Sequence, residues 1–123
     1  MNKVYPKWSE LPNLDLYLDQ VLLYVNQLDS SSIVDDDKGL TSAMINNYVK
    51  NGHLDKPIKK KYNRKQLARL IVITCLKNVF SIQEISKTIN SLTSDGSSEE
   101  MYDNFVMCMN GEKREGLAEV IVA

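Results

Sequence analysis

The sequence has little of what metal sites and disulfide frameworks require. Its 123 residues include one histidine, His53, and two cysteines, Cys75 and Cys108, that stand far apart. A structural zinc site needs several such ligands at short spacing, so the sequence argues against one. Isolated cysteines within apolar stretches favour buried free thiols over a disulfide. We therefore expect no metal and no cofactor.

Long apolar runs are also missing. The longest, residues 67–76, is interrupted by Arg69 and is far too short to cross a bilayer. The first residues, MNKVYPKWSELP, lack the apolar core of a signal peptide. These two absences predict a cytoplasmic protein with no membrane partner.

Residue sets typical of enzymes are equally scarce. The sequence has no His–carboxylate pair, no Cys–His arrangement and no glycine-rich phosphate loop. His53 is better explained as a surface residue at a helix exit, because a catalytic histidine needs an orienting partner. We expect the protein not to be an enzyme. Its length, with 43% apolar and 25% charged residues, is typical of one globular domain.

Positive charge is present, but only in the middle of the chain. Residues 1–37 hold two lysines and seven acids, net −5, and residues 93–123 have the same net charge. Residues 38–92 hold eleven Lys or Arg and only two acids, net +9. A basic block between acidic flanks indicates an anionic partner, although it says little about the fold.

Hydrophobic periodicity and capping residues predict helices. We expect them at about 14–28 with Asn13 as N-cap, at 42–50 with Thr41 as N-cap, at 63–78, from 81 onward and at 99–110. Asn51-Gly52 is a typical helix stop, and residues 63–66 and 81–84 form capping boxes. The β-branched residues 71–74 also fit a buried strand, but the cap and the helix-forming neighbours favour a helix.

A basic segment, HLDKPIKKKY, separates the second and third helices. Pro57 excludes helix there and favours an extended form or a small hairpin. A short capped helix, a glycine exit, a basic extended segment and two further capped helices are the layout of a winged helix-turn-helix. We therefore predict an all-α, winged helix-turn-helix fold.

Within this layout, residues 40–89 resemble the DNA-binding half of the mercury-resistance regulators, the MerR-like proteins. The residues that carry the resemblance are Thr41, Tyr48, Gly52, Leu54, Pro57, Tyr62, Asn63 and 81–85. Residues 10–110, including LDLYLDQV and MINNYVK, are more closely similar to an uncharacterised bacterial family, domain of unknown function 1836. The resemblance implies a MerR-like domain over residues 1–92 and a helical extension over 93–123.

The chain also has the two residue types that DNA recognition requires. Asn46 and Asn47 on the second helix suit base reading, because Asn pairs well with adenine. Backbone contacts are expected from Tyr48, Lys50, Lys56, Lys59, Lys60, Lys61, Arg64, Lys65 and Arg69. Each of these roles has an alternative. Tyr48 is equally explained as a core residue, and the lysines as a solvated loop. The two asparagines are alternatively polar caps of a buried turn. The sequence thus predicts a transcriptional regulator that binds double-stranded DNA.

Two features differ from the usual regulator. The wing, residues 52–62, is short, and a long loop containing Asp35, Asp36 and Asp37 stands where a tight turn is usual. Three aspartates would repel phosphate unless they point away from DNA. An adaptor that binds a protein partner through its basic face is the alternative function.

The last predicted helix has two interpretations. DNA-binding regulators are commonly dimers, and the broad apolar face of residues 99–110 is a candidate homodimer element. The same face serves equally well as a cap on the core of a single domain.

Overall fold

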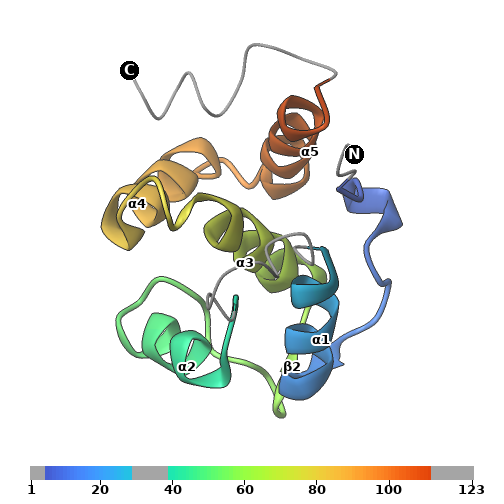
Figure 1. The fold of residues 1–123 in the computed structure, drawn as a ribbon, viewed down its shortest axis with the longest axis vertical. Coiled ribbons are helices and arrows are strands. Elements are labelled where there is room, and N and C mark those ends of the chain that lie inside the picture. The colour runs from blue at the N-terminus through green and yellow to red at the C-terminus, as the bar shows by residue number, and fades with distance from the viewer. Residues whose placement is uncertain (1–4, 29–38, 112–123) are drawn as a thin grey trace.

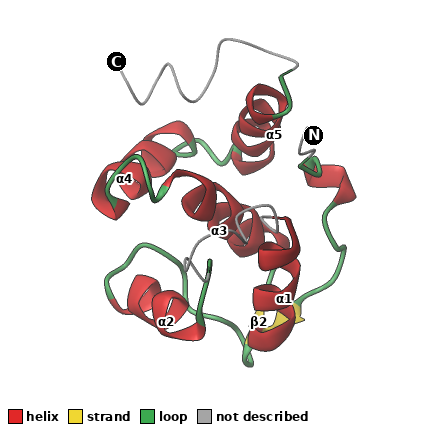
Figure 2. Ribbon diagram, viewed as in Figure 1, coloured by secondary structure: helices red, strands yellow, loops and turns green. Residues whose placement is uncertain are grey.

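The computed structural model describes residues 5–28 and 39–111, which form a mostly helical fold with one two-stranded sheet (Figures 1 and 2). The elements are a 3-10 turn Trp8–Glu10, β1 Leu16–Tyr17, α1 Leu18–Leu28, α2 Ser42–Lys50, β2 Lys61–Tyr62, α3 Arg64–Leu76, α4 Ile82–Leu92 and α5 Ser98–Met109. Within these described ranges, no helix has both the length and the apolar character to span a bilayer.

Helix α3 is the centre of the fold, in contact with α1, α4, α5 and β2 (Figure 1). Its buried side chains lie on every side of the helix, including Leu67, Leu70, Ile71, Val72 and Ile73. Residues 70–74 are all buried, as expected in the centre of a core, where each apolar side chain stabilises the fold by roughly 1.5–3 kcal/mol. The β-branched residues 71–74 lie within this helix and not in a strand, as the capping residues predicted.

Capping side chains set where α3 and α4 begin. The Asn63 side chain accepts a hydrogen bond from the Gln66 amide (2.9 Å), and the Gln66 side chain accepts one from the Asn63 amide (2.7 Å). Ser81 and Glu84 exchange the same two bonds at the start of α4 (3.1 and 3.0 Å). Both predicted capping boxes are confirmed, and each satisfies backbone donors that a helix start leaves unpaired.

The predicted first helix, residues 14–28, is wrong at its start. Helix α1 begins at Leu18, because Leu16 and Tyr17 pair antiparallel with Tyr62 and Lys61. Leu14, predicted on the buried stripe, is 64% exposed. The pairing joins β1 to the strand that enters α3, so it attaches the N-terminal segment to the basic segment.

Asn13 is not the N-cap of that helix. Its side chain accepts a hydrogen bond from the Arg64 guanidinium (2.7 Å). The Gln20 side chain instead accepts from the Tyr17 amide (2.8 Å), three residues before it. The helix start was misplaced because the extended Leu16–Tyr17 pair interrupts an otherwise helical spacing of leucines.

The asparagine side chain of Asn26 fixes α2 against α1. Its amide nitrogen donates to the Leu40 carbonyl (2.9 Å), and its oxygen accepts from the Leu40 amide (2.9 Å). A Cβ on Gly39, which has φ +71°, would lie 2.5 Å from that oxygen. Glycine at position 39 therefore allows Asn26 to reach the backbone just before α2. The predicted loop with Asp35, Asp36 and Asp37 lies outside the described residues.

Helix α5 packs against the core of the chain, which is the second of its two interpretations. Its apolar side chains Met101, Tyr102, Phe105 and Val106 are buried, whereas Met109 is 41% exposed. The Tyr102 hydroxyl donates to the Pro6 carbonyl (2.8 Å), and burial raises the pKa of this phenol. A dimer through the buried face would require these contacts to open.

The N-terminal segment is attached to α5 by hydrogen bonds. The Asn110 side chain accepts from the Tyr5 amide (2.8 Å) and donates to the Tyr5 carbonyl (3.1 Å). Asp103 accepts from the Trp8 amide (2.8 Å). The same asparagine–backbone pairing that joins α1 to Leu40 thus joins the two ends of the described fold.

Neither Cys75 nor Cys108 forms a disulfide within the described residues, and both are half-buried where full burial was predicted. Each lies one residue before the end of its helix. The part of the prediction that concerned full burial is wrong.

Candidate nucleic-acid interface

Helix α2 has one buried face and one open face. Thr41 caps it by accepting from the Met44 amide (3.2 Å), and Ile45 and Tyr48 point into the core. Its C-terminal end is closed by hydrogen bonds from the Gly52 amide to Val49 (3.2 Å) and from the His53 amide to Tyr48 (2.8 Å). This is a Schellman closure around a left-handed glycine, so the predicted caps at both ends of α2 are confirmed.

The open face of α2 carries both asparagines that were predicted to read bases. Asn46, Asn47 and Lys50 are exposed and line a shallow hollow on the surface together with Ala43 and Met44. The Asn47 oxygen accepts from the Asn51 side chain (2.8 Å), while Asn46 has no side-chain bond within the described residues. Neither asparagine caps a buried turn, so both amides are accessible to a partner.

The basic segment forms a small hairpin, as predicted. The amide of each of Ile58 and Lys61 donates to the carbonyl of the other (2.9 and 3.0 Å). Between them, Lys59 and Lys60 have φ +53° and +69°. Two positive φ values make this a type I′ turn, which normally requires Asn-Gly or Gly residues. Lysine in this conformation is strained, and such strain is concentrated at functional sites.

Relief of this strain should be measurable. Replacing Lys59 by Asn and Lys60 by Gly is expected to raise the free energy of unfolding by about 1–2 kcal/mol, since both new residues tolerate left-handed backbone. Urea denaturation provides the measurement. The double Gln variant at the same positions is the matched control, because it removes the same two charges without relieving the backbone. Equal stability of the two variants would contradict the strain.

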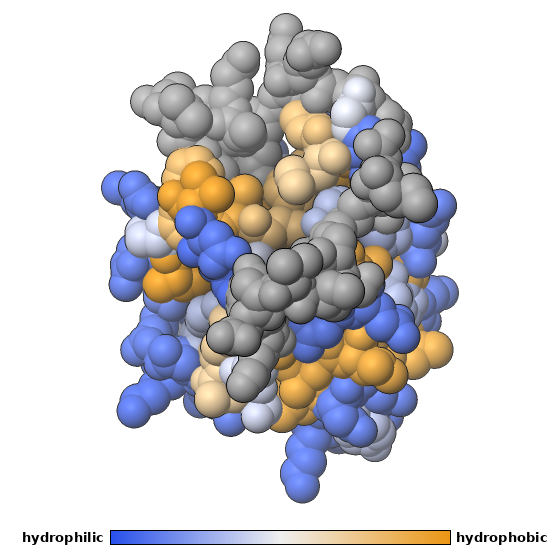
Figure 3. Space-filling model, in the orientation of Figure 1, coloured by the Kyte–Doolittle hydropathy of each residue, from blue (hydrophilic) through white to orange (hydrophobic). Residues whose placement is uncertain are grey.

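Five lysines of the basic block have exposed side chains without a counter-ion. None of Lys50, Lys56, Lys59, Lys60 and Lys65 forms an ion pair or a side-chain hydrogen bond within the part of the chain that the structure describes. Hydrophilic side chains project from the lower margin of the molecule in Figure 3, where the hairpin lies in Figure 1. These five lysines define the free lysine set.

The other three cations predicted to contact the DNA backbone already have partners in the chain. The Lys61 ammonium lies 5.1 Å from the centroid of the Tyr17 ring. The Arg64 guanidinium lies 5.9 Å from the centroid of the Trp8 ring and donates a hydrogen bond to the Asn13 side chain. Arg69 is half-buried on α3 and donates to the His53 carbonyl (2.5 Å).

Tyr48 is a core residue, which is one of the two interpretations that the sequence left open. The residue is 8% exposed, and burial raises the pKa of its phenol. Its hydroxyl makes no hydrogen bond within the described residues, yet that oxygen is not fully buried. The ring is thus a core residue while the hydroxyl reaches the surface.

Comparison with known families matches residues 6–105 to the family described as Domain of unknown function (DUF1836). The chain belongs to this family. No curated protein and no solved structure matches it. The DUF1836 match covers every element of the described fold except the end of α5, so the interface lies entirely within the family domain.

Neither Asn26 nor the β1–β2 pairing of this DUF1836 domain was predicted. Asn26 binds Leu40, fourteen positions away, and nothing in its neighbourhood distinguishes it from a surface residue of α1. Among the residues that the structure describes, no group of three or more His, Cys, Asp or Glu is placed to hold a metal ion.

Proposed function

We propose that this protein is a transcriptional regulator that binds double-stranded DNA through a MerR-like winged helix-turn-helix. In this proposal α1 and α2 are the helix pair, α2 enters the major groove, and the hairpin 58–61 is a short wing. Asn46 and Asn47 face the base edges, and the free lysine set contacts phosphates.

The observation that carries the proposal is the position of two accessible asparagines next to lysines that have no counter-ion. In Figure 1, α2 and the hairpin lie at the same end of the molecule. The Asn46 and Asn47 side chains are exposed on α2, and the free lysine set spans α2, the hairpin and the start of α3. In such an arrangement the helix reads the base edges in the groove, and the flanking cations position the protein on the phosphate backbone.

The long connection between α1 and α2 does not weaken the proposal. A helix-turn-helix normally has a tight turn that holds its two helices together. Here the bonds between Asn26 and Leu40 give the start of α2 a fixed attachment to α1. The relative position of the helices is therefore supported without a tight turn.

Binding to a duplex of arbitrary sequence, titrated with salt, tests the proposal. If all five lysines contact phosphate, the slope of log affinity against log salt should be about −4.5, from ~0.9 per contact. Absence of binding at low salt would contradict DNA binding and favour a protein partner for the basic face.

Asn46 and Asn47 should contribute to the sequence preference of DNA binding and not to its salt dependence. Changing either to Ala is expected to reduce discrimination at one base pair by about 1–3 kcal/mol and to leave the salt slope unchanged. Selection of bound duplexes from a random pool, followed by affinity measurements on single-base variants, gives both quantities. Gln83→Ala, which removes an exposed amide on α4, is the control. Unchanged preference in all three variants would remove α2 from the reading role.

A further inference from the structure

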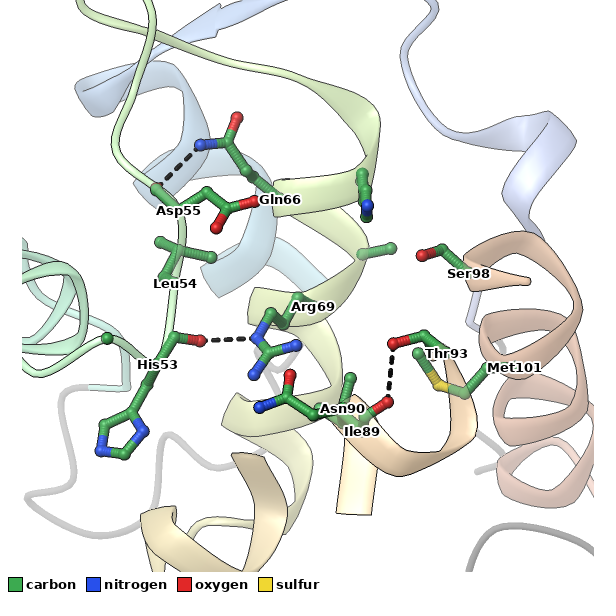
Figure 4. A pocket seen from close by; sticks show the side chains of 13 residues that line it. His53, Leu54, Asp55, Gln66, Arg69, Ile89, Asn90, Thr93, Ser98 and Met101 are labelled. Atoms are coloured by element: carbon green, nitrogen blue, oxygen red, sulfur yellow. Dashed lines mark hydrogen bonds between the residues drawn. The ribbon is translucent and has the colours of Figure 1, made fainter. Parts of the chain in front are cut away.

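A cavity of about 150 Å³ lies between the connection that follows α2 and the three helices α3, α4 and α5 (Figure 4). Residues 52–55 form one wall, and side chains of the helices form the others. Its volume corresponds to roughly five water molecules at ~30 Å³ each. Sites for drug-sized ligands are larger, so this cavity is suited to a small molecule.

Arg69 lines the cavity and has unused hydrogen-bond donors. A guanidinium carries five N–H groups. Its Nε donates to the His53 carbonyl (2.5 Å) and its Nη2 to the Ser86 hydroxyl (2.9 Å), as Figure 4 shows for the first of these. Within the described residues, nothing accepts a bond from Nη1 or from the second Nη2 hydrogen. The free end of the guanidinium therefore has three N–H groups for a ligand, two on Nη1 and one on Nη2, and a carboxylate can accept more than one of them.

The charge of Arg69 has no counter-ion either. Burial lowers the pKa of its guanidinium, and the Asp55 carboxylate, which also lines the cavity, opposes this effect without forming an ion pair. Lys65 adds a second cation to the lining. Two cations against one carboxylate leave the cavity positive, and partly buried charges in proteins are normally paired.

The remaining walls are divided between polar and apolar groups. Ile89 of α4 and Met101 of α5 are buried apolar side chains of the lining. The Asn90 amide and the Ser98 hydroxyl also line the cavity and make no side-chain hydrogen bond within the described ranges. A ligand with an anionic head and a short apolar body would meet suitable groups at both ends.

We propose that this cavity binds a small organic carboxylate, with its carboxylate on the free end of Arg69 and near Lys65 and its apolar body against Ile89 and Met101. The site goes beyond DNA binding and does not depend on it. Because Arg69 also holds the His53 carbonyl, the bound ligand would stabilise the connection between α2 and the hairpin. An effect of the ligand on DNA affinity is the one part that rests on the proposed function.

Titration of the ¹⁵N-labelled full chain with propanoate tests the site by NMR. Saturable shifts are expected at the amides of Gly52 and His53 and at the Arg69 Nε–H signal. Propanamide and sodium chloride at equal ionic strength are the neutral and ionic controls, and neither should reproduce the shifts. Absence of saturation, or equal shifts with chloride, would overturn the proposal.

Two variants assign the binding to the named residues. Lys65→Gln removes an exposed cation of the lining and should weaken propanoate binding several-fold, whereas Lys87→Gln, on an exposed part of α4, should not. Arg69→Lys keeps the charge but loses the planar set of N–H donors and should weaken binding at least tenfold. If Arg69→Lys does not fold, the comparison of the two Gln variants still tests the site. Equal propanoate affinities of these two variants would refute it. Propanoate binding by a chain that fails to bind duplex DNA would leave the site standing and contradict the proposed function alone.

Discussion

Replacing Lys56, Lys59 and Lys60 together by Gln is expected to flatten the salt dependence of duplex binding by about 2.7 in the log–log slope, at ~0.9 per phosphate contact. The same relation, extrapolated to no effect at 1 M salt, gives an affinity loss of about three thousandfold at ~0.05 M. The three side chains are exposed and have no partner within the described residues, so the fold should be retained. Lys61 is left in place because its ammonium lies over the Tyr17 ring.

The single variant Lys87→Gln provides the control for this experiment. Lys87 is exposed on α4, outside the proposed interface, and its removal should leave the slope unchanged. Fluorescence anisotropy on one duplex at several salt concentrations gives all the slopes. A triple variant with the slope of the wild type would mean that the hairpin lysines are a solvated loop.

The second large effect is expected at Asn26. Changing Asn26 to Ala leaves the amide and the carbonyl of Leu40 without their partners, although Leu40 is only 2% exposed. Unsatisfied buried backbone groups cost roughly 1–3 kcal/mol each, so the loss of both partners should lower the free energy of unfolding by about 2–6 kcal/mol. Gln27→Ala, an exposed neighbour on α1, should change it by less than about 0.5 kcal/mol. Urea denaturation of both variants provides the comparison, and equal stabilities would contradict the role of Asn26.

A double-mutant cycle tests whether glycine is required at position 39 because the Asn26 side chain approaches it closely. Gly39→Ala places a Cβ 2.5 Å from the Asn26 side-chain oxygen and also imposes the cost of a positive φ. In the Asn26→Ala background the close approach is gone and only the backbone cost remains. The Gly39 substitution should therefore destabilise the variant less than the wild type. Strict additivity would show that the two positions act independently.

The elements that local signals determine were predicted most accurately. Both ends of α2 and the starts of α3 and α4 follow from side chains within three or four residues of the helix ends, such as Thr41 and Ser81. The type of structure at residues 71–74 could also be predicted, because a helix cap precedes an apolar run. A small hairpin was one of the two forms predicted for the basic segment, because Pro57 disfavours helix there.

Interactions between distant residues could not be predicted in the same way. The pairing of β1 with β2 involves two residues on each strand, too few to leave a periodic pattern, and it displaced the start of α1. In the candidate site, the exposure of Asn46 and Asn47 followed from the helical spacing of α2. The inward position of Arg69 did not, because a lysine-rich segment does not reveal which of its cations has a partner across the fold.

The most direct test of the account is NMR mapping of the surface that contacts DNA. A short duplex added to the ¹⁵N-labelled protein should shift signals of Asn46, Asn47 and Lys50 and those of the hairpin tip at Lys59 and Lys60. The amides of α5, at the opposite end of the molecule in Figure 1, should remain in place. Shifts confined to α5, or spread evenly over the surface, would contradict a groove-reading α2 with a short basic wing.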